Sequence, residues 1–240
     1  MRLSTLVQLA PLEDIPWSPR DVARGTLWVA VLFMTMILGM AISYFILFRL
    51  RVGFDALQTG VLSATFAAEV TMAWAAWRWS VHKYGCSWAS LGLRGFRFGL
   101  GLSLTLAVLL GGLLVNVLYV LSITMLGWQF LLPPPLPEVL RGQGVDTAML
   151  AVLAVGVAPF AEEIFFRGFF FGGLQARWGF GRAAAASALI FSLGHLQVGT
   201  LLPVFILGLF LAWLRARTGS LWPCIIVHLA YNGLGLLTMA

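Results

Sequence analysis

Residues 98–121 read FGLGLSLTLAVLLGGLLVNVLYVL, an apolar run without a charged residue. A helix of roughly 20 such residues is long enough to cross the ~30 Å hydrocarbon core of a bilayer. The whole chain of 240 residues has the same character, since 60% of its residues are hydrophobic and only 10% are charged. Soluble domains carry about 25% charged residues. The sequence therefore predicts an integral membrane protein.

Similar apolar segments recur along the chain and predict an all-α fold, a polytopic transmembrane helix bundle of about seven spans, within a range of six to eight. The expected spans cover residues 26–48, 56–79, 98–121, 147–171, 183–196, 201–213 and 221–239. A proline cluster interrupts them, and proline cannot continue a helix because it lacks a backbone N–H. Its members are Pro133, Pro134, Pro135 and Pro137. We expect a polar leader over residues 1–25 and a single transmembrane domain over residues 26–240.

The net charge of +6 does not indicate a nucleic-acid binder, because the basic residues stand singly between apolar segments. Lys and Arg concentrate in the cytoplasmic loops of membrane proteins. The seven expected spans place twelve basic residues on one side and three on the other. The twelve are Arg2, Arg20, Arg24, Arg78, Lys83, Arg94, Arg97, Arg167, Arg177, Arg182, Arg215 and Arg217, and the three are Arg49, Arg51 and Arg141. This split predicts a cytoplasmic N-terminus.

The fourth segment contains the charged stretch Ala161-Glu162-Glu163-Ile164-Phe165-Phe166-Arg167. An ionised side chain in the middle of a spanning helix costs at least about 2.5–3.5 kcal/mol, so it usually faces a cavity or a partner. Glu163 and Arg167 are four residues apart and share a helix face, which predicts an ion pair. Glu162 is rotated by about 100° from Glu163, so it points away from the face that Glu163 shares with Arg167. A carboxylate without a neighbouring cation is a candidate general base.

Two further apolar segments carry polar side chains that could join Glu162. The fifth contains Phe191-Ser192-Leu193-Gly194-His195, and the seventh contains His228-Leu229-Ala230-Tyr231-Asn232. If the helices form a bundle, we expect Glu162, His195, His228 and Asn232 to converge on one pocket. A carboxylate and an imidazole can deprotonate and orient a water, and an imidazole and a carboxamide can bind an oxyanion. The set suits hydrolysis of an amide bond.

The ordered motifs Glu162-Glu163-x-x-x-Arg167, Phe191-x-x-x-His195 and His228-x-x-x-Asn232 resemble those of the CPBP intramembrane protease family. This family includes the CAAX prenyl endopeptidases and bacterial relatives tied to bacteriocin processing and self-immunity. The resemblance covers the C-terminal third of the chain, and Leu91-Gly92-Leu93-Arg94 resembles a short segment that often precedes the family's core.

The resemblance implies an intramembrane endopeptidase with a catalytic core over about residues 147–240, in a prokaryotic cytoplasmic membrane. Its partners would be membrane lipids and a membrane-associated protein or peptide substrate, which is lipidated in one branch of the family. Glu162 and His195 would activate water, His228 and Asn232 would bind the oxyanion, and Glu163 with Arg167 would support the site. We expect no cofactor, although Glu162, His195 and His228 could ligate zinc.

Other interpretations of the same residues remain open. Glu163 with Arg167 more simply forms a structural ion pair, and Asn232 alone would be an interhelical hydrogen-bond donor. Glu69, in the second segment, is expected to pair with a neighbouring helix or to line the cavity, outside the catalytic set. A membrane immunity or scaffold protein could use the same pocket for binding alone. A small transporter is disfavoured, because the sequence shows no internal hydropathy repeat.

Overall fold

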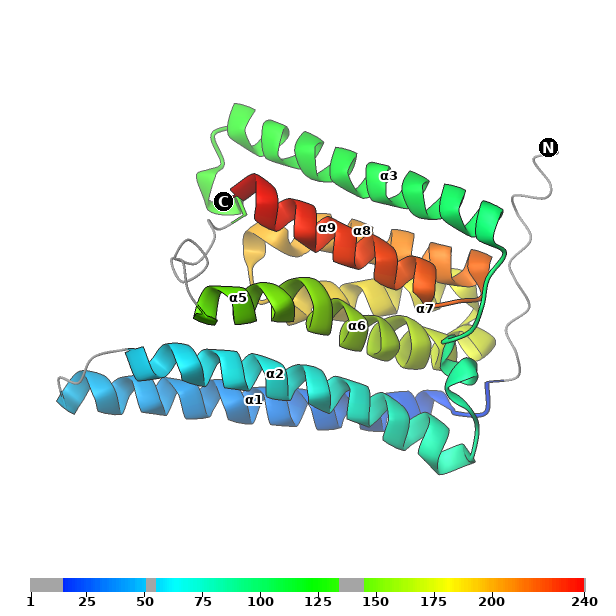
Figure 1. Cartoon of the computed structure of the whole chain (residues 1–240), viewed down its shortest axis with the longest axis horizontal. Coiled ribbons are helices and arrows are strands. Elements are labelled where there is room, and N and C mark those ends of the chain that lie inside the picture. Colours follow the sequence, from blue (N-terminus) through cyan, green and yellow to red (C-terminus); the bar gives the residue numbers. More distant parts are fainter. Residues whose placement is uncertain (1–14, 51–54, 134–144, 240) are drawn as a thin grey trace.

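A computed structural model describes residues 15–50, 55–133 and 145–239, and all the regular structure within these ranges is helical. Figure 1 shows long helices lying side by side. The all-α membrane bundle predicted from the sequence is confirmed. The long elements are α1 (Pro19–Leu50), α2 (Asp55–Trp77) with the π-helical η2 (Arg78–His82), α3 (Phe98–Met125), the continuous α5 (Val145–Val152), η5 (Leu153–Val157), α6 (Ala158–Glu163) and η6 (Ile164–Phe171), then α7 (Gly172–Gly194), α8 (Val198–Thr218) and α9 (Trp222–Met239).

The helices agree with the expected spans in place and roughly in number. Within the described residues, α1, α3 and α8 are each long and apolar enough to cross a membrane, and α9 contains a shorter apolar helix. The fourth expected span is the run from α5 through η6. The fifth is the second part of α7, which follows a break at Gly179, where φ is 74°. Glycine adopts this positive φ without the steric cost that a side chain brings.

The main difference from the sequence prediction lies at the start of the first helix. The leader was expected to extend to residue 25, but α1 begins at Pro19 and Trp17 is fully buried before it. The indole Nε1 of Trp17 donates to the carbonyl of Phe169 at 2.9 Å. Gly173 permits this packing, because a Cβ there would lie 2.6 Å from the Trp17 ring. Trp17 and Val22 therefore pack part of the expected leader into the core of the bundle.

Asp21 joins the start of α1 to the end of α2. Its buried carboxylate accepts hydrogen bonds from the Tyr84 hydroxyl at 2.7 Å, from Ser18 and from the Lys83 ammonium. The hydrogen bond to Asp21 raises the pKa of Lys83 above its usual value. The contact fixes α1 against α2 at this end of the bundle.

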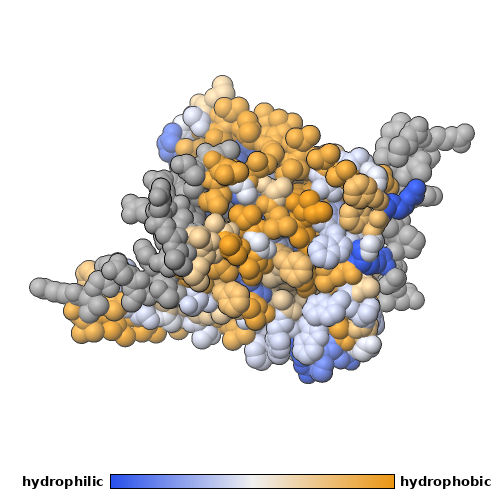
Figure 2. All heavy atoms as spheres, viewed as in Figure 1, coloured by the Kyte–Doolittle hydropathy of each residue, from blue (hydrophilic) through white to orange (hydrophobic). Residues whose placement is uncertain are grey.

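The same end of the bundle gathers the connections that carry the basic residues. Arg94 donates through Nε to the carbonyl of Gly219 at 2.8 Å, which ties the loop before α3 to the loop after α8. Figure 2 shows a broad hydrophobic surface in the middle of the molecule, with hydrophilic atoms towards its edges. Several residues used in the sequence prediction lie outside the described residues: residues 1–14 of the leader, Arg2, Arg51, Arg141, Pro134, Pro135 and Pro137.

The helices stack in layers that place the charged stretch at the centre. In Figure 1, α3 lies on one side, α8 and α9 come next, α5 and α6 follow, and α1 with α2 forms the opposite side. Both α6 and η6 contact α2, while α6 also contacts α9 and η6 contacts α7. Every residue of η6 is buried. The carboxylates of α6 therefore reach helices on several sides.

Candidate active site

A fully buried ion pair stands at the centre of the site. Nη1 of Arg167 lies 3.0 Å from Oε1 of Glu163, and both side chains have no exposed surface. Nη2 of the same guanidinium lies 3.5 Å from the carbonyl of Gly208 on α8. Gly208 also lets α8 pack closely against α7, because a Cβ there would lie 2.9 Å from Ala188 and 3.4 Å from Nη2 of Arg167. The structure thus contains the ion pair expected from the i, i+4 spacing.

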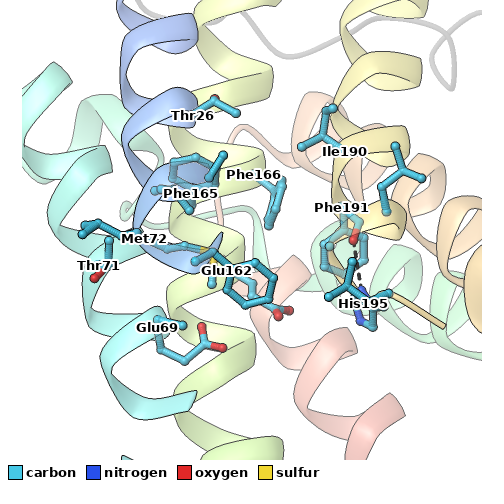
Figure 3. A pocket seen from close by; sticks show the side chains of 18 of the residues that line it. Thr26, Glu69, Thr71, Met72, Glu162, Phe165, Phe166, Ile190, Phe191 and His195 are labelled. Atoms are coloured by element: carbon cyan, nitrogen blue, oxygen red, sulfur yellow. Dashed lines mark hydrogen bonds between the residues drawn. The ribbon is translucent and has the colours of Figure 1, made fainter. Parts of the chain in front are cut away.

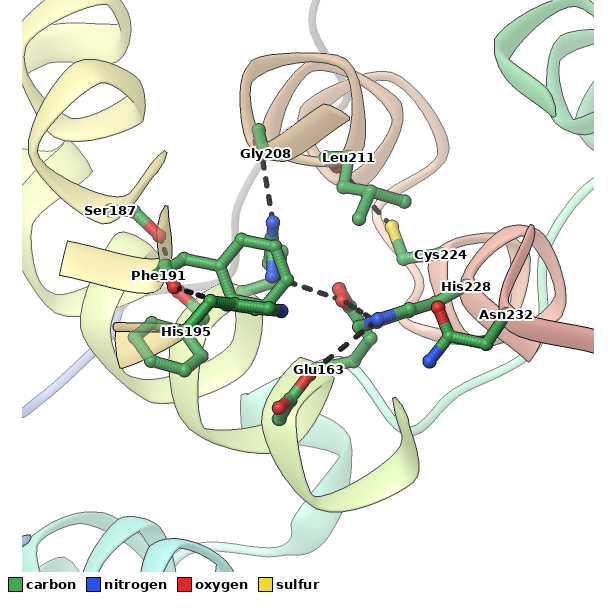
Figure 4. Close-up of polar contacts among 12 residues, drawn as sticks. Glu163, Ser187, Phe191, His195, Gly208, Leu211, Cys224, His228 and Asn232 are labelled. Carbon is green, nitrogen blue, oxygen red and sulfur yellow. Dashed lines mark hydrogen bonds and ion pairs between the residues drawn. The ribbon is translucent and has the colours of Figure 1, made fainter. Parts of the chain in front are cut away.

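His228 of α9 bridges the two adjacent glutamates. Its Nδ1 lies 2.9 Å from Oε1 of Glu163 (Figure 4), and its Nε2 lies 3.5 Å from Oε2 of Glu162. A carboxylate beside Nδ1 holds the proton on that nitrogen and fixes the orientation of the ring. The Glu163 oxygen that binds Arg167 therefore also positions His228, and Nε2 is directed towards Glu162.

Phe191 of α7 holds the cationic and imidazole groups in place. The guanidinium carbon of Arg167 lies 4.2 Å from the centre of the Phe191 ring. The rings of His195 and His228 pack edge-on against it, with centroids 5.0 Å and 5.6 Å away. A cation over an aromatic face is attracted by the ring quadrupole. The sequence motif included Phe191 but gave no indication of this role.

Glu162 and His195 face a common pocket of about 350 Å³ between α1, α2, α6, η6 and α7. Glu162 is 16% exposed, so its carboxylate is accessible from the pocket, whereas Glu163 is sealed. Nδ1 of His195 lies 2.9 Å from the carbonyl of Phe191, so Nε2 is the ring nitrogen that can bind a substrate or a water. Figure 3 shows Glu162, His195 and Glu69 at the same end of this pocket. Of the four residues expected to converge on one pocket, Glu162 and His195 line it, whereas His228 and Asn232 are not among its lining residues.

Asn232 of α9 has a backbone partner that the sequence analysis did not anticipate. Its Nδ2 donates to the carbonyl of Ala154 at 2.9 Å. In η5 the N–H of Ala158 bonds the carbonyl of Leu153, five residues back. The next residue, Pro159, has no N–H to give to Ala154. The widened turn and the proline thus leave the Ala154 carbonyl without a backbone donor, and the Asn232 amide supplies the missing N–H.

The described side chains do not form a group of three or more His, Cys, Asp or Glu that could hold a metal ion. Both ring nitrogens of His228 face carboxylates, and Nδ1 of His195 faces the Phe191 carbonyl. Glu162, His195 and His228 are not brought together as such a group among the described residues, and we derive no step through a metal.

Comparison with known proteins identifies the part of the chain that holds these residues. Residues 144–234 match the family model described as "Type II CAAX prenyl endopeptidase Rce1-like". A protein of Bacillus subtilis (strain 168) named "Putative membrane peptidase YdiL" is 34% identical over 84 residues, which are 35% of this chain and 34% of that protein. The chain therefore matches about a third of the length of this curated relative. No solved structure gives a significant match. Over residues 144–234, the chain's resemblance to the CPBP intramembrane protease family is confirmed.

Proposed function

We propose that this chain is an intramembrane endopeptidase that hydrolyses a peptide bond in a membrane-associated protein or peptide. The observation that carries the proposal is the accessible Glu162 carboxylate, which opens on the pocket while His228 stands behind it, held by Glu163. A histidine oriented by a buried carboxylate is a recurring arrangement in hydrolytic sites. The match to a prenyl endopeptidase family agrees with this function.

In the proposed mechanism, Glu162 and His195 bind one water from two walls of the pocket. Nε2 of His195 accepts a hydrogen bond from this water, because Nδ1 is directed to the Phe191 carbonyl. Glu162 takes a proton from the water while the water oxygen attacks the scissile carbonyl carbon. The same proton then passes from Glu162 to the amine nitrogen as the C–N bond breaks, giving a carboxylic acid and an amine.

The oxyanion formed in this step requires hydrogen-bond donors, and we assign them to His228 and Asn232. Asn232 uses one N–H of its amide on Ala154 and keeps a second N–H for the substrate. His228 supplies its Nε2 proton when the ring is doubly protonated between the two glutamates. Removing one oxyanion donor commonly costs about 10²–10³ in kcat.

The general-base assignment is tested by Glu162→Gln, which keeps the shape of the side chain and removes the base. Peptide pools from cells that express the wild-type protein or the variant are compared by mass spectrometry. We expect cleavage products to disappear in the variant while thermal unfolding of the purified protein stays unchanged. Ser103→Ala, on the outer surface of α3, serves as the control with full activity. Equal products in the Glu162 variant would contradict the assignment, and retained biological activity without cleavage would favour a binding protein.

We also propose that the reaction proceeds without zinc. The purified wild-type protein should contain far less than one zinc per chain, and its cleavage activity should persist in excess chelator. Elemental analysis provides the measurement. Stoichiometric zinc that is lost in both His195→Ala and His228→Ala would overturn this proposal.

We also propose how the protein is oriented in the membrane. We place the N-terminus and the loops joined by Arg94 and Gly219 in the cytoplasm, because Lys and Arg gather at that end. A membrane-impermeant thiol reagent applied to intact cells should leave Cys86 unlabelled and should label it after lysis. Labelling of Cys86 in intact cells would reverse the orientation.

A further inference from the structure

Glu69 of α2 is a buried acid that the proposed mechanism does not use. Its side chain is only 6% exposed, and Oε2 has no hydrogen-bond partner among the described residues. Burying a carboxylate without a partner is unfavourable, and an opposite charge can offset this cost. Glu69 also lies outside residues 144–234, so the family match assigns it no role.

Glu69 stands where two cavities meet. It lines the pocket that holds Glu162 and His195, and it also lines a second cavity of about 470 Å³ between α2, α6 and α9. The second cavity is otherwise lined by apolar side chains and glycine, including Val157, Trp222 and Leu229. Figure 3 shows the Glu69 carboxylate beside the first pocket, near Glu162. Glu69 is therefore shared by the pocket that holds Glu162 and by an apolar recess.

The charges around these cavities are not balanced at Glu69. Glu163 has Arg167 and His228 as partners, and Glu162 has His228. Among the described residues that line the two cavities, there is no Lys or Arg. The Glu69 carboxylate is thus available to a cationic group of the ligand.

We propose that Glu69 is a specificity-determining residue that binds a positively charged side chain of the substrate, next to an apolar segment that occupies the second cavity. The substrate class is accordingly a membrane-associated peptide with a Lys or Arg close to the cleaved bond. This proposal rests on the proposed endopeptidase function and extends it to a subsite that α2 supplies.

The test compares cleavage specificities on a peptide library made from a membrane proteome. The wild-type protein, Glu69→Gln and Glu162→Gln each digest the library in detergent, and mass spectrometry reads the new ends. We expect Lys and Arg to be enriched at one position beside the cleaved bond in the wild-type digest. In Glu69→Gln this enrichment should fall about tenfold or more, mainly through KM rather than kcat. Glu69→Lys should shift the preference towards Asp and Glu.

Two outcomes would overturn the subsite: a wild-type digest without a basic preference, or a preference that Glu69→Gln retains. If the wild-type and Glu162→Gln digests are both empty, the proposed endopeptidase function fails instead. The subsite is then tested by binding alone. A leucine-rich peptide amide with one Lys should raise the thermal unfolding midpoint of the wild-type protein but not that of Glu69→Gln, whereas the same peptide with Gln should raise neither. Equal shifts for both peptides would again overturn the proposal.

Discussion

The helices from α6 to α9 and the pair α1–α2 hold their polar groups in different ways, although α6, η6 and α7 line one pocket together with α1 and α2. In the apolar stretch of α8, 44% of the residues are buried, whereas none are in that of α1. Glu163, Arg167 and His228 are almost completely buried, and each has a partner. Glu69, on α2, has no Lys or Arg among the described residues that line its two cavities. The packed region therefore holds its charged groups against one another, while the other wall presents a carboxylate without a cationic partner to a bound ligand.

The largest expected effect comes from breaking the packed side at Arg167. Arg167→Met leaves Glu163 as a buried carboxylate without its guanidinium, which costs about 3–5 kcal/mol of unfolding free energy. Arg49→Met, on the exposed end of α1, removes the same charge and should change stability by less than about 0.5 kcal/mol. Denaturant unfolding in detergent measures both. Similar values for the two variants would remove the contrast between the regions.

A smaller effect is expected where α1 is fixed to α2. Asp21→Ala removes the acceptor of the Lys83, Tyr84 and Ser18 hydrogen bonds, and we expect a loss of about 1–3 kcal/mol. Hydrogen exchange followed by mass spectrometry should show faster exchange in α1 and α2 but not in α8. Thr35→Ala, whose hydroxyl bonds within its own helix, is the control. Faster exchange across the whole bundle would show that the two walls unfold together.

The smallest effect concerns the backbone behind Asn232. Pro159→Ala restores an N–H that can bond the Ala154 carbonyl, so the Asn232 amide loses its fixed partner. Hydrogen bonds between membrane helices average about 0.6 kcal/mol with a maximum near 1.7. Cleavage should therefore slow by about threefold to eighteenfold, while stability stays equal or rises.

A double-mutant comparison separates this role from a general structural one. If Pro159 acts through Asn232, adding Pro159→Ala to Asn232→Ala should slow cleavage no further. Multiplied losses in the double variant would show that the two residues act independently.

The sequence was sufficient to predict the features that depend on local spacing and composition. Apolar runs located the helices, and the i, i+4 spacing predicted the ion pair of Glu163 with Arg167. The ordered motifs predicted the family resemblance that the comparisons confirm over residues 144–234. Each of these depends on residues that are neighbours along the chain or on one helix face.

Features that depend on contacts between distant segments were not predictable in this way. The sequence analysis grouped His228 with Asn232, but the structure directs His228 to the two glutamates and Asn232 to Ala154. The reason is the π-helical turn at η5 before Pro159, which spacing alone does not reveal. For Glu69 the sequence allows either a partner on a neighbouring helix or a place in the cavity wall. The packing of α2 against α6 shows that Glu69 lines the cavity. The catalytic roles of these residues remain predictions.

The lack of burial along the apolar stretch of α1 has a consequence for how such a protein diverges. A wall that contributes little to the stability of the rest can accept many substitutions without unfolding the molecule. Related chains could therefore acquire new cleavage targets by changing α1 and α2, while the chemistry held between α6 and α9 is inherited unaltered. Substrate range and catalysis would then evolve at different rates within one small bundle.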